Sequence, residues 1–349
     1  MSQALSEFLD WRKHGYADTR ALGECLQALV DEGLDQLPLP ASGQTLDRWR
    51  SLACVAGHDL GLCKLYEGHT DALAIMQELR PEGAGSKGSG SALAEPGTTW
   101  GMWAAEPPQA RVRVSGTGQS VKLDGRKAWC SGAAVVSHGL VTCWNEDGQQ
   151  QLVAVDMRQP GVNVTQEGWR AVGMAATGSV EVQFEAAHGI AVGEPDSYIQ
   201  RAGFWQGGIG IAACWYGASR AIASRLLQHV IKHDEPHAQA HLGAVDTALH
   251  SAINVLQHAA HCIDQAPQDN AELLARRSRA AIEHSAEQII THVGHALGAG
   301  PYCKDAHFAR LMADLPVFLR QSHAERDLAA LGRLSAAHTA TPPSRTWTL

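Results

Sequence analysis

The segment Gly125–Gly132, GRKAWCSG, places a tryptophan and a serine two residues apart, directly after a basic Gly-Arg-Lys turn. The neighbouring segments are typical of short antiparallel strands. Buried tryptophan is common in small β-domains, so Trp129 could simply fill the core while Ser131 lies in a turn. A binding role is the alternative hypothesis, and it depends on the segments that surround the pair.

The eighteen histidines suggest a second kind of chemistry, which is metal binding. His233, His237 and His241 recur every four residues, so one helical face could present them to Zn or Fe. Pro236 interrupts this series, and the helical segments lack the Glu-x-x-His motifs that di-iron bundles carry on two helices. We therefore expect packed or solvated histidines and no metal site.

The composition excludes several classes of protein. The net charge is -8, and the basic residues form no concentrated face that could bind nucleic acid. No segment reaches the apolar length of a membrane span, and the first residues lack the apolar stretch of a secretory signal. The eight cysteines are scattered without a Cys-x-x-Cys pair, as is typical of reduced thiols. We expect a cytoplasmic protein without disulfides or structural zinc.

The hydrophobic period changes twice along the 349 residues. It is helical up to about Leu79, becomes two between Gly101 and Val192, and is helical again in four long segments that suit an antiparallel bundle. We expect an α+β fold with a helical domain and linker at 1–99, a small β-sandwich or barrel at 100–198, a four-helix bundle at 199–338 and a tail at 339–349.

The linker itself, PEGAGSKGSGSALAEPGTTW, is rich in glycine and serine and could be mistaken for a phosphate-binding loop. It fails the P-loop pattern because Lys87 is followed by Gly88 and not by Ser or Thr, and no strand precedes it. A surface loop is the better interpretation.

Four stretches, in this order, resemble motifs of the acyl-CoA dehydrogenase superfamily of flavoproteins. They are WAAEPP, LDGRKAWCSGA, GWRAVGMAATGSVEVQF and HALGAGPYCKDAHFARLMADL. The resemblance covers nearly the whole chain and implies the same fold, in which a β-domain stands between two helical parts. It also implies an FAD cofactor and a homodimer or homotetramer.

The resemblance assigns roles to six residues. Trp129 would pack on the flavin ring, and Ser131 would hydrogen-bond near its N5 atom. The backbone N–H groups of Ala104 and Ala105 would bind the pyrimidine end of the flavin. The turn that contains Gly298 and Gly300 would approach the adenosine or pyrophosphate half, normally in a neighbouring subunit.

The sequence departs from the family at the cofactor site. The Gly-Ala-Gly-Ser-Asp loop that normally follows Glu-Pro is missing after Pro107. The segment whose arginine normally meets the pyrophosphate reads IKHDEPHAQAHLG, where Lys232 and His233 are the nearby cations. These changes predict that FAD is bound with lower affinity or is held by different residues.

The sequence also departs from the family at the catalytic base. The family's glutamate would fall at Ser322, eight residues after Asp314, or near Gly207, and neither position is acidic. His323 and Glu325 lie close by and could serve as the base. Ser322 and Glu325 also have the spacing of a capping box at the start of a helix.

The first functional expectation is therefore an FAD-dependent enzyme that oxidises the CH–CH group of an acyl thioester or a related small substrate; an electron acceptor protein is a possible partner that the sequence does not identify. The alternatives are a reduced-flavin-dependent monooxygenase on the same fold, or a flavin-free relative that acts as a binding or assembly subunit.

Overall fold

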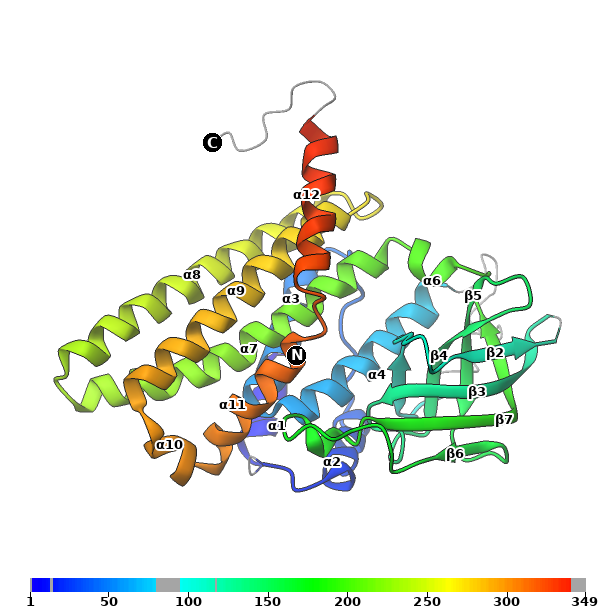
Figure 1. Cartoon of the computed structure of the whole chain (residues 1–349), viewed down its shortest axis with the longest axis horizontal. Coiled ribbons are helices and arrows are strands. Elements are labelled where there is room, and N and C mark those ends of the chain that lie inside the picture. Colours follow the sequence, from blue (N-terminus) through cyan, green and yellow to red (C-terminus); the bar gives the residue numbers. More distant parts are fainter. Residues whose placement is uncertain (1, 13–14, 80–94, 117, 340–349) are drawn as a thin grey trace.

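The computed structural model describes residues 2–12, 15–79, 95–116 and 118–339. These ranges form an α+β fold in which the β-domain lies at one side and the long C-terminal helices extend to the other (Figure 1). The predicted order of helices, sheet and helices is confirmed. None of the helices in the described ranges combines the length and the hydropathy that a membrane span requires.

The N-terminal helices are α1 (Ser2–Asp10), α2 (Thr19–Asp31), α3 (Thr45–His58) and α4 (Leu60–Glu78). Aspartates cap two of them, because Asp18 accepts a hydrogen bond from the backbone of Ala21 and Asp59 from that of Leu62, both at 2.9 Å. Most of α4 is buried, since it packs against the sheet on one side and against helices on the other.

The strands are β1 (Trp100–Trp103), β2 (Val112–Ser115), β3 (Ser120–Cys130), β4 (His138–Trp144), β5 (Gln150–Asp156), β6 (Val162–Val164) and β7 (Val180–Val192). Buried and exposed residues alternate along β2 and along the first part of β3, as their alternating sequences predict. β4 pairs with β5, β5 with β7, β7 with β3, β3 with β2 and β2 with β4, which closes a small barrel. β1 extends it by pairing in parallel with β4.

The C-terminal helices are α6 (Ser197–Gln200), α7 (Gly203–Lys232), α8 (Pro236–Gln265), α9 (Glu272–Leu297), α10 (Ala299–Lys304), α11 (Ala306–Leu319) and α12 (Glu325–Thr339). α7, α8 and α9 pack on one another, and α7 also packs on α3. The fourth long segment, predicted as one helix, is instead α11 and α12. It breaks because the backbone N–H of His323 donates to the Asp327 carboxylate (2.9 Å) and Ala324 adopts a φ of 44°.

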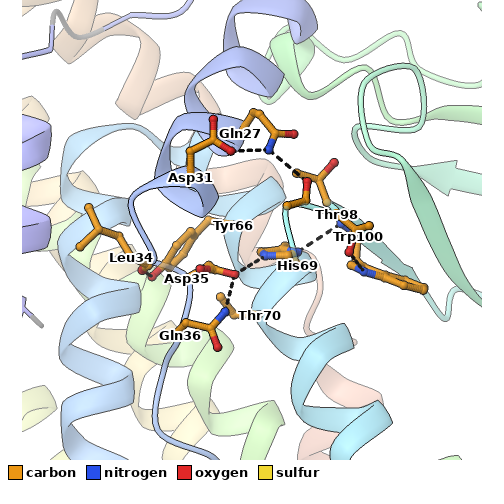
Figure 2. A network of polar contacts seen from close by, with 12 residues as sticks. Gln27, Asp31, Leu34, Asp35, Gln36, Tyr66, His69, Thr70, Thr98 and Trp100 are labelled. Carbon is orange, nitrogen blue, oxygen red and sulfur yellow. Dashed lines mark hydrogen bonds and ion pairs between the residues drawn. The ribbon is translucent and has the colours of Figure 1, made fainter. Parts of the chain in front are cut away.

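A buried hydrogen-bond network ties β1 to the N-terminal helices (Figure 2). The backbone N–H of Trp100 donates to His69 Nδ1 (3.2 Å), so Nδ1 must accept and the ring hydrogen lies on Nε2. Nε2 then donates to Asp35 Oδ2 at 3.0 Å. Both side chains are almost fully buried, so this network fixes the start of β1 against α4.

A buried lysine joins β3, β4 and the segment that follows β1. Lys127 Nζ donates to Glu106 Oε1 (2.6 Å), to the carbonyl of Thr142 (2.8 Å) and to Thr142 Oγ1 (2.7 Å), which uses its three hydrogens. Glu106 also accepts from Thr142 Oγ1 (2.6 Å) and from Trp144 Nε1 (2.9 Å). The side chain of Lys127 is fully buried, so each of these bonds is shielded from water.

We predict that Lys127→Met lowers the free energy of unfolding by about 3 kcal/mol, because it leaves Glu106 without its cation and Thr142 without a donor. Urea denaturation measures the change. Lys122→Met is the matched control, since Lys122 lies exposed on the same strand and should cost less than about 0.5 kcal/mol. Equal losses in the two variants would contradict a special role for Lys127.

Candidate functional site

Trp129 lies near the end of β3 and is 49% exposed, so the hypothesis that it fills the core of the β-domain is wrong. Its φ of 58° lies in the left-handed region, which costs an L-residue about 1–2 kcal/mol. Such strain persists where the surrounding structure enforces it, and it is common at functional sites. The exposed indole therefore offers a flat apolar surface to a ligand.

Ser131 is buried beside Trp129, and its backbone is held on two sides. Its N–H donates to the carbonyl of Trp129 (3.1 Å), and its own carbonyl accepts from Trp103 Nε1 (3.1 Å). The Trp103 ring lies against Gly101 and Gly139, where an added Cβ would come within 2.5 Å and 2.4 Å of the indole. Glycine at these two positions thus lets Trp103 support the Ser131 backbone.

Ala104 and Ala105 directly follow β1 and are half-buried. Their backbone N–H groups donate no hydrogen bond to any residue in the described ranges. Two successive unpaired donors are unusual, because backbone N–H groups away from water are nearly always paired. The bonds of the next residue, Glu106, to Lys127 hold this segment in place.

A narrow cavity of about 10 Å³ separates α4 from the residues around Ser131. Lys64, Gly68 and Trp103 line it together with Ser131, and the space is barely enough for one water molecule. Lys64 forms an ion pair with Glu67, and burial raises the pKa of the Glu67 carboxyl. The α4 side of the site is therefore closed and contains a buried charged pair.

Three hydroxyl groups form a continuous chain behind Ser131. Ser131 Oγ lies 2.7 Å from Ser179 Oγ, which lies 2.7 Å from Thr177 Oγ1. Thr177 Oγ1 donates to the carbonyl of Met174 at 2.7 Å. Thr177 and Ser179 belong to the stretch GWRAVGMAATGSVEVQF, but the sequence analysis gave neither of them a role of its own.

The hydroxyl chain ends at Met174, and α11 fixes the backbone of that residue. The Asp314 carboxylate accepts from the backbone N–H of Met174, which has a φ of 58°. Arg310 lies 3.5 Å from Asp314 and 3.6 Å from Asp59, so one guanidinium pairs with two carboxylates. Burial raises the pKa of both carboxyl groups. The loop before β7 is thus tied to α11 and to the start of α4.

Ser322 and His323 lie in the turn between α11 and α12, and Glu325 is the first residue of α12. The expected capping box is wrong, because Ser322 Oγ accepts from the backbone of Ala324 (3.1 Å) and Asp327, not Glu325, accepts from that of His323. The His323 imidazole is half exposed and lies 3.7 Å from the Asp327 carboxylate. Glu325 is exposed.

One arginine binds the backbone beside each of the two positions where the family resemblance expects the catalytic carboxylate. Arg279 donates to the carbonyl of Gly208 (2.6 Å) and to that of Gln321 (3.4 Å). These are the neighbours of Gly207 and Ser322. Sequence reasoning missed Arg279, although its ring contact with Trp215, 4.7 Å from the guanidinium carbon to the ring centroid, holds it in place.

Gly298 and Gly300 lie at the start of α10, at the end of the molecule opposite the barrel (Figure 1). Both are exposed, and a Cβ added at either would meet open space. The barrel that carries Trp129 and the helix α10 lie apart within one subunit in Figure 1. The expected role of Gly298 and Gly300 therefore requires a second copy of the chain.

The remaining candidates lie elsewhere. His233 precedes α8, whereas His241 lies on it and its Nδ1 is 2.9 Å from that of His292. In the described ranges, no group of three or more His, Cys, Asp or Glu side chains could hold a metal ion. A cavity of about 440 Å³ lies on the barrel wall beside Trp100, His138 and other residues, none of which was predicted from the sequence.

Residues 90–187 match the family model of the acyl-CoA dehydrogenase middle domain. Similar solved structures include methanesulfinate monooxygenase MsuC from Pseudomonas fluorescens (16% identity, 98% of each chain, TM-score 0.78). They also include FMN-bound TdsC from Paenibacillus sp. A11-2 (16%, 98% of each chain, 0.80). A nitrososynthase from Micromonospora carbonacea var. africana aligns over 89% of this chain and 88% of its own (18%, 0.74).

No curated protein matches the sequence. At identities below one fifth, the similar structures show the fold alone. The match of the middle domain and the shared fold agree with the resemblance to the acyl-CoA dehydrogenase superfamily that the four sequence motifs suggested.

We predict opposite effects on stability for the two tryptophans of the site. Trp129→Gly should leave the free energy of unfolding unchanged or raise it by up to about 1 kcal/mol, because it relieves the left-handed strain of an exposed residue. Trp103→Ala should lower it by about 3–5 kcal/mol, because Trp103 is buried. Thermal and urea unfolding measure both, and a large loss for Trp129→Gly would show that the indole packs in the core.

Proposed function

We propose that this protein is a reduced-flavin-dependent monooxygenase that acts on a small molecule. The observation that carries the proposal is the replacement of the expected base. Oxidation across a CH–CH bond needs a carboxylate to remove a proton, yet Gly207 and Ser322 occupy its two positions and Arg279 lies against the neighbours of both. A guanidinium has no basic lone pair at physiological pH.

Trp129, Ser131 and the backbone of Ala104 and Ala105 have the chemical groups that would bind a flavin ring. The exposed indole of Trp129 would stack on the ring, and the unpaired N–H groups of Ala104 and Ala105 would donate to the oxygen and nitrogen acceptors of its pyrimidine end. Ser131 would hydrogen-bond its reactive edge. When bound, a reduced flavin would supply the electrons that activate dioxygen.

FMN is the form of flavin that we propose. The FAD expected from the resemblance needs contacts to a pyrophosphate, and the arginine of that contact is absent from the sequence. Gly298 and Gly300 lie at the start of α10, which Figure 1 shows away from the barrel of the same subunit. TdsC, which shares the fold, is bound to FMN. FAD held across a subunit interface is the competing proposal.

The substrate that we propose is compact. The cavity between α4 and Ser131, which Trp103 helps to line, is about 10 Å³ and does not hold an acyl chain. The similar structures include a methanesulfinate monooxygenase and a complex of TdsC with FMN and indole, both of which involve small molecules. For proton transfer we propose His323, oriented by Asp327, with Ser322 and Glu325 as its neighbours. Oxidation of an acyl thioester remains the competing activity.

We also propose a homodimer or a dimer of dimers, formed through the C-terminal helices. Leu227 and Ile231 on α7 are 47% and 73% exposed, and Leu328 on α12 is 54% exposed. Leu227 and Ile231 lie four residues apart on α7 and so share one face of that helix, and exposed apolar faces of this kind are typical of subunit interfaces. Light scattering at micromolar concentration should give at least twice the mass of one chain. A monomer would contradict the proposal.

Flavin binding is the first functional prediction. Trp129→Ala should weaken binding of FMN about tenfold, since an aromatic stack contributes about 1 kcal/mol or more beyond its buried area. Trp11→Ala is the matched control, because Trp11 is 91% exposed and lies after α1, outside the segments assigned to the flavin site. Fluorescence titration measures both. If the wild type binds neither FMN nor FAD, the chain is a flavin-free relative and the proposed enzyme is wrong.

The reaction class is tested separately. Photoreduced FMN, the protein and labelled dioxygen are mixed with indole or methanesulfinate, and mass spectrometry measures label in the product. We expect incorporation that depends on the protein. In a parallel experiment, oxidised flavin and a panel of acyl-CoA thioesters should show no loss of flavin absorbance. Bleaching by an acyl-CoA, without incorporation of oxygen in the first experiment, would establish a dehydrogenase instead.

A further inference from the structure

The hydroxyl chain behind Ser131 has a fixed direction. A carbonyl oxygen can only accept, so the hydrogen of Thr177 Oγ1 must point to Met174 O at 2.7 Å. Thr177 Oγ1 then has only lone pairs left for Ser179, so the Ser179 hydrogen must point to Thr177. Ser179 Oγ in turn accepts, and the single hydrogen of Ser131 is committed to it. Each hydroxyl donates away from the proposed ligand.

The hydrogen bond from Thr177 to Met174, at the end of the hydroxyl chain, cannot easily reverse its direction. The Met174 carbonyl accepts from Thr177 twice, through Oγ1 at 2.7 Å and through the backbone N–H at 3.1 Å. Asp314 holds the backbone N–H of the same residue. Turning the Thr177 hydrogen around would leave two oxygen atoms 2.7 Å apart with no hydrogen between them, in a buried setting where an unmade bond is costly.

We infer that Ser179, acting through this chain, makes Ser131 a hydrogen-bond acceptor toward the bound ring and thereby makes the site selective for reduced over oxidised flavin. The inference rests on the proposed flavin site. The N5 atom of an oxidised flavin is a bare acceptor, whereas that of a reduced flavin carries a hydrogen. A lone pair on Ser131 Oγ can accept the N5 hydrogen of the reduced flavin, whereas it faces another lone pair at N5 of the oxidised flavin. Ser179 and Thr177 are positioning residues, since neither contacts the ring.

The selectivity has a measurable size. Reduced FMN gains a hydrogen bond to Ser131 that oxidised FMN lacks, so the protein should bind reduced FMN about tenfold or more tighter. By linkage, a tenfold preference raises the potential of the bound flavin by about 30 mV relative to free flavin, because the couple transfers two electrons. This second readout does not depend on turnover.

The experiment compares dissociation constants of the full-length protein for oxidised FMN and for photoreduced FMN under anaerobic conditions. In Ser179→Ala, Ser131 loses its acceptor and can turn its hydrogen to the ring. Binding of oxidised FMN should therefore tighten several-fold while binding of reduced FMN weakens, and the ratio should approach one. Thr177→Val, which preserves shape, should change the ratio in the same direction. Ser224→Ala removes an exposed hydroxyl from α7 and should leave both constants unchanged.

The outcomes separate this inference from the proposed function. Equal affinity of the wild type for both forms, or an equal loss for both forms in Ser179→Ala and Thr177→Val, would overturn the inference while leaving a flavin site intact. Tighter binding of oxidised FMN by the two variants than by the wild type would support the inference, since loss of a merely structural contact does not improve binding. If the wild type binds neither form, the flavin site and the inference both fail.

Discussion

The buried ammonium group of Lys127 is the interaction on which the candidate site depends. It lies within β3, two residues before Trp129, and its hydrogens reach Glu106 after β1 and Thr142 on β4. A charge without access to water is costly unless it is paired, so loss of any one of these contacts would destabilise the junction of the three segments. These contacts fix the backbone two residues before the exposed Trp129 and the residue directly after the unpaired N–H groups of Ala104 and Ala105.

A second constraint comes from the helical part of the chain. Asp314 on α11 holds the backbone of Met174, and the carbonyl of that residue orients the hydroxyl chain that ends at Ser131. The hydrogen-bonding character of Ser131 is thus decided outside the barrel. Because the carboxylate is buried and shares Arg310 with Asp59, the start of α4 belongs to the same network. The packing of α11 and α4 against the barrel therefore also sets the orientation of the hydroxyl groups behind Ser131.

The period of the apolar residues predicted the order of helices, strands and helices, because burial of one face imposes that period in each element. It could not predict the break between α11 and α12, since the segment keeps helical spacing and the break depends on Asp327 accepting from the backbone of His323. Trp129 and Ser131 attracted attention by their types. Ser179 did not, because its contact with Ser131 joins residues 48 apart along the chain, and Asp314 lies 140 residues from Met174.

The central claim is that the end of the barrel marked by Trp129, Ser131 and Ala105 is the site of a flavin ring. A crystal structure of the protein soaked with FMN tests this most directly. We expect the ring to lie against the Trp129 indole, with its pyrimidine end at the N–H groups of Ala104 and Ala105. Ordered FMN at any other place, such as the cavity beside Trp100 and other residues on the barrel wall, would contradict the account.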